Sequence, residues 1–186
     1  MRFVLSVAVV AVLFANPAHA ETPLERGFAG ALRGCEEWVL NPKSWASGVA
    51  PFVSAVGLGD KMGAVARVDE ASLPPPSLRV ANHYWRINST PKAGFVLVVS
   101  DQLPMCHITG GGDADLQPIV ESILATSAFT SRWERVKDEA KGDMASSEFR
   151  SREEPKFWLV ISRAKRPGQR LDRVQVLASA LFSTAK

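Results

Sequence analysis

The spacing of apolar residues near the start of the chain is helical. Apolar side chains recur every three or four residues across positions 23–40, which gathers them on one face of a helix. Pro42 follows this run, and we expect the helix to end there, because the residue before a proline disfavours helical backbone angles. A second helix is predicted within 42–56, although Gly48 and Pro51 interrupt its pattern.

Later in the chain the apolar period falls from near 3.6 to near 2, which indicates β-strands. Short connections between the strands favour antiparallel hairpins. One amphipathic helix, predicted over 116–128, interrupts them. The predicted fold class is α+β: N-terminal helices plus an antiparallel sheet of about six to eight strands with one inserted amphipathic helix, in a single domain. The predicted strands cover 62–68, 79–88, 94–100, 105–110, 132–138, 144–152, 156–164 and 171–183.

The segment from Met105 to Pro118, MCHITGGGDADLQP, combines residue types that occur in several kinds of functional site. Its three glycines would let the chain leave a strand, and Asp113 or Asp115 would cap the helix that follows. A phosphate loop is not predicted, because no lysine follows the glycines. A calcium loop is not predicted either, because Leu124 stands where the bidentate glutamate belongs. We therefore interpret the segment as scaffold and expect no metal and no cofactor.

Residues 1–20 have the pattern of a secretory signal. Arg2 precedes an apolar run at 3–15 that only Ser6 interrupts, and positions 18–20 read Ala-His-Ala, the small-x-small pattern that signal peptidase cleaves. We expect cleavage after position 20, which leaves 21–186 as a single secreted α+β domain, with the periplasm as the favoured compartment. No later apolar run approaches the roughly 20 residues of a membrane span. An uncleaved N-terminal anchor is the alternative.

The two cysteines, Cys35 and Cys106, are predicted to form a disulfide, because the predicted export takes them to an oxidising compartment. Cys35 falls on the apolar face of the first predicted helix. Two free buried thiols are the alternative. A catalytic thiol is not expected at Cys106, because its neighbour His107 would point to the opposite face of the strand.

Two histidines remain after the predicted cleavage, His83 and His107, and both fall in predicted strands. With Asp101 or Asp113 they could form an acid–base or metal site, if the strands are neighbours and the imidazoles share a face. Neither HxH nor HExxH spacing is present, so we expect half-buried strand residues instead and assign no catalytic residue.

The overall charge does not identify a partner, but one region is basic. The chain has a net charge of +3, and loss of Arg2 would leave 21 basic residues against 19 acidic ones, too near neutrality to predict nucleic-acid binding. Region 150–173 holds eight basic residues against three acidic ones. We predict that it contacts an anionic envelope component or an acidic protein; solvated charge on an ordinary hairpin is the alternative. The residues assigned to this contact are Arg163, Lys165, Arg166, Arg170 and Arg173.

The five tryptophans are many for a domain of this size. Trp38 and Trp45 flank the predicted helix break at Pro42, so we expect their rings to lie close together. Core packing is the usual role of such rings, and an exposed ring pair that lines a ligand groove is the alternative.

These observations favour a small secreted, non-catalytic binding or envelope-accessory domain whose ligand and partner are unknown. The alternative, from another class, is a secreted hydrolase or metal-dependent enzyme that uses His83, His107 and a nearby aspartate.

The signal and the cysteine pair make a joint prediction about the exported protein. Its intact mass should correspond to a chain that begins at Glu21 and lacks two hydrogens relative to the reduced form. Two thiols that react with an alkylating agent under native oxidising conditions would contradict the disulfide.

Overall fold

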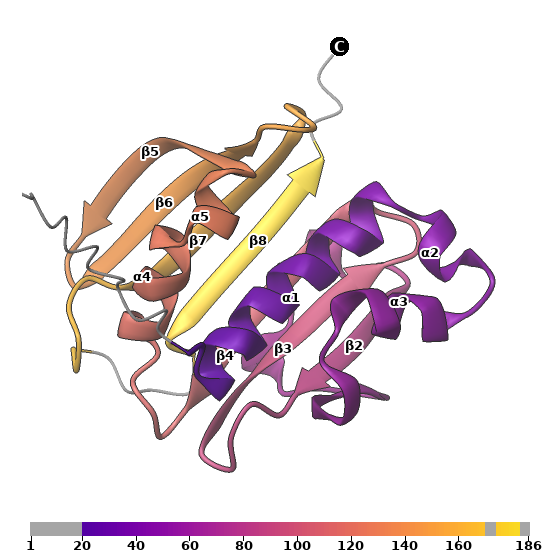
Figure 1. The fold of residues 1–186 in the computed structure, drawn as a ribbon, viewed down its shortest axis with the longest axis horizontal. Helices are drawn as coiled ribbons and strands as arrows, with labels where there is room; N and C mark the ends of the chain where they lie inside the picture. The colour runs from indigo at the N-terminus through magenta and orange to yellow at the C-terminus, as the bar shows by residue number, and fades with distance from the viewer. Residues whose placement is uncertain (1–19, 170–173, 183–186) are drawn as a thin grey trace, which may run out of the picture.

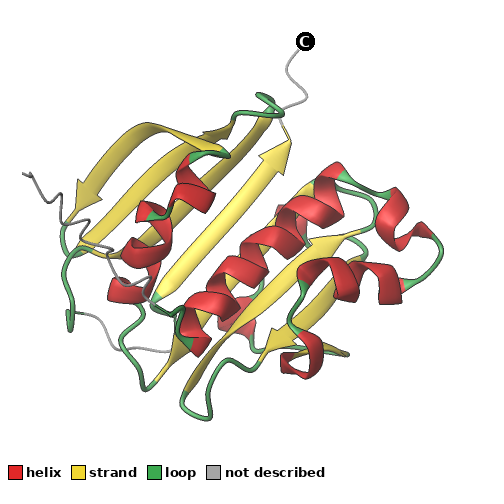
Figure 2. Cartoon of the chain, in the orientation of Figure 1, coloured by secondary structure: helices red, strands yellow, loops and turns green. Residues whose placement is uncertain are grey.

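The computed structural model of the protein describes residues 20–169 and 174–182. In this part of the chain, one antiparallel sheet of eight strands, in the order β1-β2-β3-β4-β8-β7-β6-β5, carries helices against one face (Figure 1, Figure 2). The predicted α+β fold is confirmed. The predicted signal lies outside the described residues, apart from Ala20.

The strands are β1 (Met62–Val65), β2 (Asn82–Ile87), β3 (Ala93–Ser100), β4 (Met105–Gly112), β5 (Trp133–Lys141), β6 (Met144–Ser151), β7 (Phe157–Ala164) and β8 (Val176–Phe182). The helices are α1 (Pro23–Leu40), α2 (Lys43–Ala46), α3 (Val49–Val56), α4 (Gln117–Ala125) and α5 (Ser127–Thr130), with three short 3₁₀ turns at Gly59–Lys61, Glu70–Ser72 and Pro76–Leu78.

The sheet consists of two four-stranded meanders. Each follows a group of helices in the chain: α1 to α3 precede β1 to β4, and α4 and α5 precede β5 to β8. The meanders meet through their last strands, because β4 pairs antiparallel with β8 from Met105 opposite Leu181 to Gly110 opposite Val176. As a result, β1 and β5 are the outer edges of the sheet.

Helix α1 has the bounds that the apolar period predicts. Thr22 caps it: the Glu25 amide donates to the Thr22 hydroxyl at 3.2 Å, and the Glu25 carboxylate accepts from the Thr22 amide at 2.7 Å. This capping box satisfies two of the amides that a helix start leaves without partners. At the other end, the Asn41 amide bonds to the Glu37 carbonyl before Pro42.

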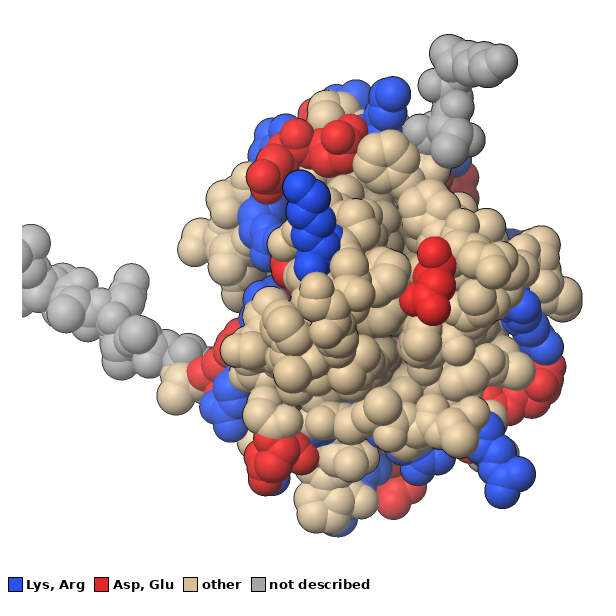
Figure 3. All heavy atoms as spheres, turned by 90° about the vertical axis from the view of Figure 1, so that its right-hand side faces the viewer, with Lys and Arg blue, Asp and Glu red and all other residues tan. Residues whose placement is uncertain are grey.

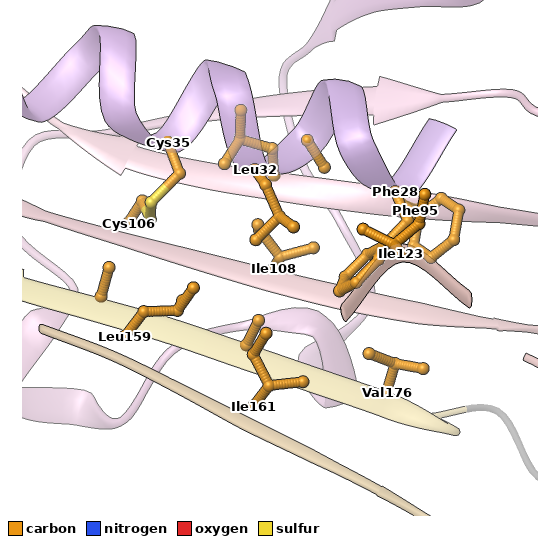
Figure 4. Packing of buried hydrophobic residues seen from close by; sticks show 14 of the residues in the cluster. Phe28, Leu32, Cys35, Phe95, Cys106, Ile108, Ile123, Leu159, Ile161 and Val176 are labelled. Atoms are coloured by element: carbon orange, nitrogen blue, oxygen red, sulfur yellow. A yellow bond between two sulfur atoms is a disulfide. The ribbon is translucent and has the colours of Figure 1, made fainter. Parts of the chain in front are cut away.

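Helix α1 lies across the centre of the sheet and buries its apolar face there. Phe28 and Leu32 are buried against Phe95 and Ile108, and the same face of the second meander contributes Leu159 (Figure 4). The core residues on each strand occupy alternate positions, because successive side chains point to opposite faces. One hydrophobic core therefore joins both meanders, as expected for a single domain.

Two local predictions need correction. The second predicted helix is split into α2 and α3, because Gly48 adopts a φ of 127°, which few other residues tolerate. Gly110 and Gly111 do not release the chain from its strand but lie within β4, and only Gly112 has a positive φ. Gly110 is required for packing, since a Cβ there would lie 2.7 Å from the Phe95 ring.

The segment 66–81 runs along the face of the sheet opposite the helices. The Ser100 hydroxyl donates to the Val80 carbonyl at 2.6 Å, and Asp69 and Ser72 line a depression together with Thr109. This cover extends over the first meander, where the β4 residue His107 is buried. The same face of β8 is more open, and Leu181 is 47% exposed there.

Cys35 and Cys106 form a disulfide, as predicted, with their Cα atoms 5.4 Å apart. Both residues are buried, so the bond joins the underside of α1 to β4 within the core (Figure 4). It closes a loop that spans 71 positions of sequence.

Replacing both cysteines with alanine should lower the free energy of unfolding by about 4 kcal/mol, because the unfolded chain regains the entropy of that loop. Urea unfolding of the wild type and the double variant measures the difference. A reductant should shift the wild-type midpoint in the same direction and leave the variant unchanged. Equal midpoints without reductant would contradict a stabilising crosslink.

Candidate functional site

The two histidines lie on opposite faces of the sheet. His83 pairs with Val99, which pairs with Cys106, and directly paired residues share a face, so His83 is on the helix side. His107 is the next residue after Cys106 and therefore points away from the helices. Although β2 and β4 both flank β3, the two imidazoles do not converge on one site. The sequence-based alternative of a shared histidine site is therefore wrong in its geometry.

His83 belongs to a partly exposed polar pair beside an aromatic stack. Its Nε2 lies 2.7 Å from Asp101 Oδ2, and both side chains are 43% exposed. The Trp38 ring lies 5.3 Å from the imidazole and is stacked on Trp45 at 4.3 Å, as the sequence predicted. Trp38 is buried, and its Nε1 donates to the Ser100 carbonyl, so this ring belongs to the core.

His107 is buried on the face of the sheet opposite the helices. Its Nδ1 lies 2.8 Å from the Ser179 hydroxyl on β8, and burial lowers the pKa of the imidazole to about 4. Asp113 follows it by six residues, about 20 Å along an extended strand. This histidine is thus a neutral core residue at physiological pH and is remote from the predicted aspartate.

The structure describes three of the five residues assigned to the basic contact, Arg163, Lys165 and Arg166. Lys165 and Arg166 are exposed at one end of β7, where the Lys165 amide donates to the Asp143 carbonyl. Lys156, another basic residue of region 150–173, lies at the other end of β7, nine positions before Lys165, or about 30 Å along an extended strand. Arg170 and Arg173 lie outside the described residues.

Arg163 does not contribute to this surface, because its side chain is buried on the helix side of β7. It is 4% exposed, and its guanidinium donates to Glu121 of α4 and to the Ser147 hydroxyl at 2.7–2.8 Å. The sequence predicted a surface position for Arg163, because the residues of a highly charged hairpin are usually exposed to solvent. The structure instead uses Arg163 to tie α4 to the second meander.

A depression that sequence analysis did not identify runs along α1, and we call it the α1 groove. It consists of two adjoining cavities of about 310 and 330 Å³. The first reaches Asn41 and Glu153, and the second reaches Ile123 and Phe129 of the second helix group. Both cavities are bordered by the same four residues, namely Arg33, Glu36, Arg132 and Trp133.

Where the two cavities of the α1 groove adjoin, the buried Glu36 forms an ion pair with Arg132. Glu36 accepts a hydrogen bond from Trp133 Nε1 at 2.8 Å and forms a salt bridge with Arg132. Burial lowers the pKa of Arg132; Glu153 raises it and Arg33 lowers it. Glu36 is 8% exposed, so its two partners offset the cost of burying a carboxylate. The cluster therefore holds one arginine in a fixed position inside the groove.

The residues of the α1 groove come from positions nearly 100 apart, and no motif connects them. Glu36 follows Cys35 and lies just beside the apolar face of α1. Trp133 is the first residue of β5, and Arg132 directly precedes it. The one usable sequence signal is an acidic residue next to a buried helix face. It gives no indication of its partners.

Among residues 20–169 and 174–182, no group of three or more histidine, cysteine or acidic side chains is arranged to hold a metal ion. In the same residues, no helix combines the length and the apolar character needed to cross a bilayer.

The buried state of His107 predicts a pH dependence of stability. Unfolding exposes the imidazole and returns its pKa from about 4 toward 6.5, so the unfolded chain binds a proton more readily. The contribution of the neutral imidazole to the free energy of unfolding is therefore complete above pH 6.5. As pH falls toward 4, the free energy of unfolding decreases by about 3 kcal/mol. His107→Asn should lose less stability over this range than the wild type in urea unfolding at several pH values. Parallel curves for the two proteins would contradict the assignment.

Comparison with known proteins identifies no family. No known family and no curated protein matches the chain. Two solved structures match weakly, both of the immunity protein TplEi of the T6SS from Pseudomonas aeruginosa, one complexed with "L" peptide and one apo. Their identities are 10% and 11% and their TM-scores 0.29 and 0.27, over 73% of this chain. The chain spans about half of their length, 52% and 49%. At these TM-scores the likeness carries no argument about function.

Proposed function

We propose that this protein is an exported, non-catalytic binding domain and that the α1 groove receives a peptide segment of a partner protein. The signal-like pattern of residues 1–20 supports export. The Cys35–Cys106 disulfide is compatible with an oxidising compartment outside the cytoplasm.

The placement of the histidines weighs against the rival enzyme function. A general acid–base or metal site needs its groups within hydrogen-bonding reach of one reacting atom. His83 and His107 lie on opposite faces of the sheet, and the latter is buried. Beside the His83–Asp101 pair, the Ser100 hydroxyl donates to the Val80 carbonyl rather than to the imidazole.

The α1 groove carries the binding proposal. Its walls combine apolar side chains, such as Ile123 and Phe129, with charged groups of both signs, Arg132 and Glu153 among them. A polypeptide presents the same mixture of apolar and charged groups, whereas an anionic polymer would favour a uniformly basic surface. The groove follows α1, whose 18 residues span about 27 Å, a length equal to about eight residues of extended chain.

A groove-filling substitution tests this proposal. Ala128 is exposed and lines the cavity beside Phe129, so Ala128→Trp should block it without disturbing the core. Ala125→Trp, on an exposed part of α4 that does not line the groove, is the matched control.

The probe is a phage-displayed library of random 12-residue peptides, selected on the chain without residues 1–20. A class of enriched peptides should bind the wild type and Ala125→Trp with similar Kd, measured by fluorescence polarisation, and bind Ala128→Trp at least tenfold more weakly. If the peptides bind all three proteins equally, or none is enriched, the groove is not the binding site.

A further inference from the structure

The two edges of the sheet differ in their protection against another strand. β5 carries a β-bulge between Arg135 and Lys137, and six of its nine residues are charged, devices that discourage pairing at an edge. β1 has neither feature: it reads Met-Gly-Ala-Val and pairs with β2 in a regular register. Gly63 and Ala64 are exposed.

The free side of β1 presents backbone groups in the positions that a new strand requires. The Asn88 amide donates to the Lys61 carbonyl at 2.8 Å, so the residues two and four positions further, Gly63 and Val65, also bond to β2. By the same alternation, the amide and carbonyl of Ala64 point away from the sheet. No described residue bonds to them.

The surface around this edge is almost free of charge. Residues 44–59, which include α3 and most of α2, contain no Lys, Arg, Asp or Glu, and neither do residues 62–66. Between these runs, Asp60 and Lys61 pair with each other at 3.4 Å. Figure 3 views the molecule from the side where α2 and α3 lie and shows a broad area with few charged side chains. Val49 is 46% exposed in this area.

A cavity lies at the end of the free edge. It measures about 270 Å³ and is enclosed by Val49 of α3, residues 64–66 at the end of β1, and residues 82–85 of β2. Because residues 64–66 of the free edge line it, the cavity adjoins the position of a strand added along β1. Five of its eight lining residues are apolar, namely Val49, Ala64, Val65, Ala66 and Trp85, and Asn82, His83 and Tyr84 contribute polar groups.

We propose that β1 is a docking edge at which a partner protein adds an extended, uncharged strand, with one large apolar side chain in the cavity beside Val49. Backbone hydrogen bonds to Ala64 would provide affinity, and the cavity would select the sequence, as in other cases of strand addition. This inference goes beyond the proposed function and does not depend on the α1 groove.

A second copy of the chain fits this edge less well. In a symmetric pairing of two β1 strands, each copy would offer the other Gly63, Ala64 and Val65, whose side chains are too small to fill a cavity of about 270 Å³. Met62 is 7% exposed and packs in the core of its own chain. The occupant is therefore a strand of a different protein.

The test uses a substitution at Ala64 that removes its amide. Ala64→Pro removes the outward-facing amide and is tolerated on an edge strand, because that amide makes no bond to β2. Ala125→Trp, at an exposed position outside the β1 edge and its cavity, is the matched control. Ala66→Trp fills the cavity and leaves the Ala64 amide intact, which provides a second route if the proline variant proves unstable in urea unfolding.

The probe is again the random 12-residue peptide library, selected on the chain without residues 1–20. We expect a class of enriched, uncharged peptides whose Kd rises at least tenfold in Ala64→Pro and Ala66→Trp, and changes less than twofold in Ala125→Trp and in the groove variant Ala128→Trp. In the complex, the Ala64 amide should exchange with solvent at least tenfold more slowly in NMR measurements, since a bond to its backbone protects it.

Three results would overturn the inference: no enriched peptide is sensitive to Ala64→Pro or Ala66→Trp, the Ala64 amide stays unprotected in the complexes, or the wild type dimerises in sedimentation and Ala64→Pro does not. The last result would assign the edge to a second copy. Peptides that are sensitive to Ala128→Trp alone would support the α1 groove and contradict the β1 edge, so the two proposals fail separately.

Discussion

The packing of α1 across the centre of the sheet is the contact on which the rest of the structure depends. The helix rests on β3 and β4, and the Cys35–Cys106 disulfide attaches it to β4. Since β4 pairs with β8, α1 covers the region where the two meanders meet. Burial of this apolar surface is the main favourable term in folding, and the crosslink restricts the unfolded chain in the same place. The two halves of the molecule are thereby combined in one core.

The position of α1 also generates the α1 groove. α1 to α3 cover the first meander, and α4 and α5 lie over the second (Figure 1). Glu36 connects the two groups, because its carboxylate contacts Arg132 and Trp133 at the start of β5. A buried carboxylate is stable only with such partners. The cluster of Glu36, Arg132 and Trp133 therefore holds one wall of the α1 groove in place and gives that wall its charged groups.

The two-residue period of the sheet decides which chemistry the chain can perform. Cys106 and His107 are neighbours in sequence, yet one is bonded to α1 and the other is buried on the far face with Ser179. His83, three strands from β8, shares its face with Cys106. A register shifted by one residue would reverse these positions, but the apolar residues of β3 and β4 hold the register in place. The histidines therefore remain apart.

The sequence by itself determined the elements that depend on local patterns. The period of apolar residues predicted α1 with both of its ends and gave the approximate place of every strand, and two cysteines in a chain with a signal-like N-terminal pattern predicted their own pairing. The sequence can predict these features because the helix and the strands depend on residues that are close together in the sequence. The disulfide is predictable because two cysteines can pair in only one way.

Only the tertiary structure decided which of these elements meet. The pairing of β4 with β8 placed Arg163 under α4 rather than at the surface, and it brought Glu36 to Trp133 across 97 positions of sequence. It also left β1 as an edge, although its sequence resembles that of an inner strand. Contacts of this kind depend on the order of strands in the sheet, and no local period in the sequence records that order.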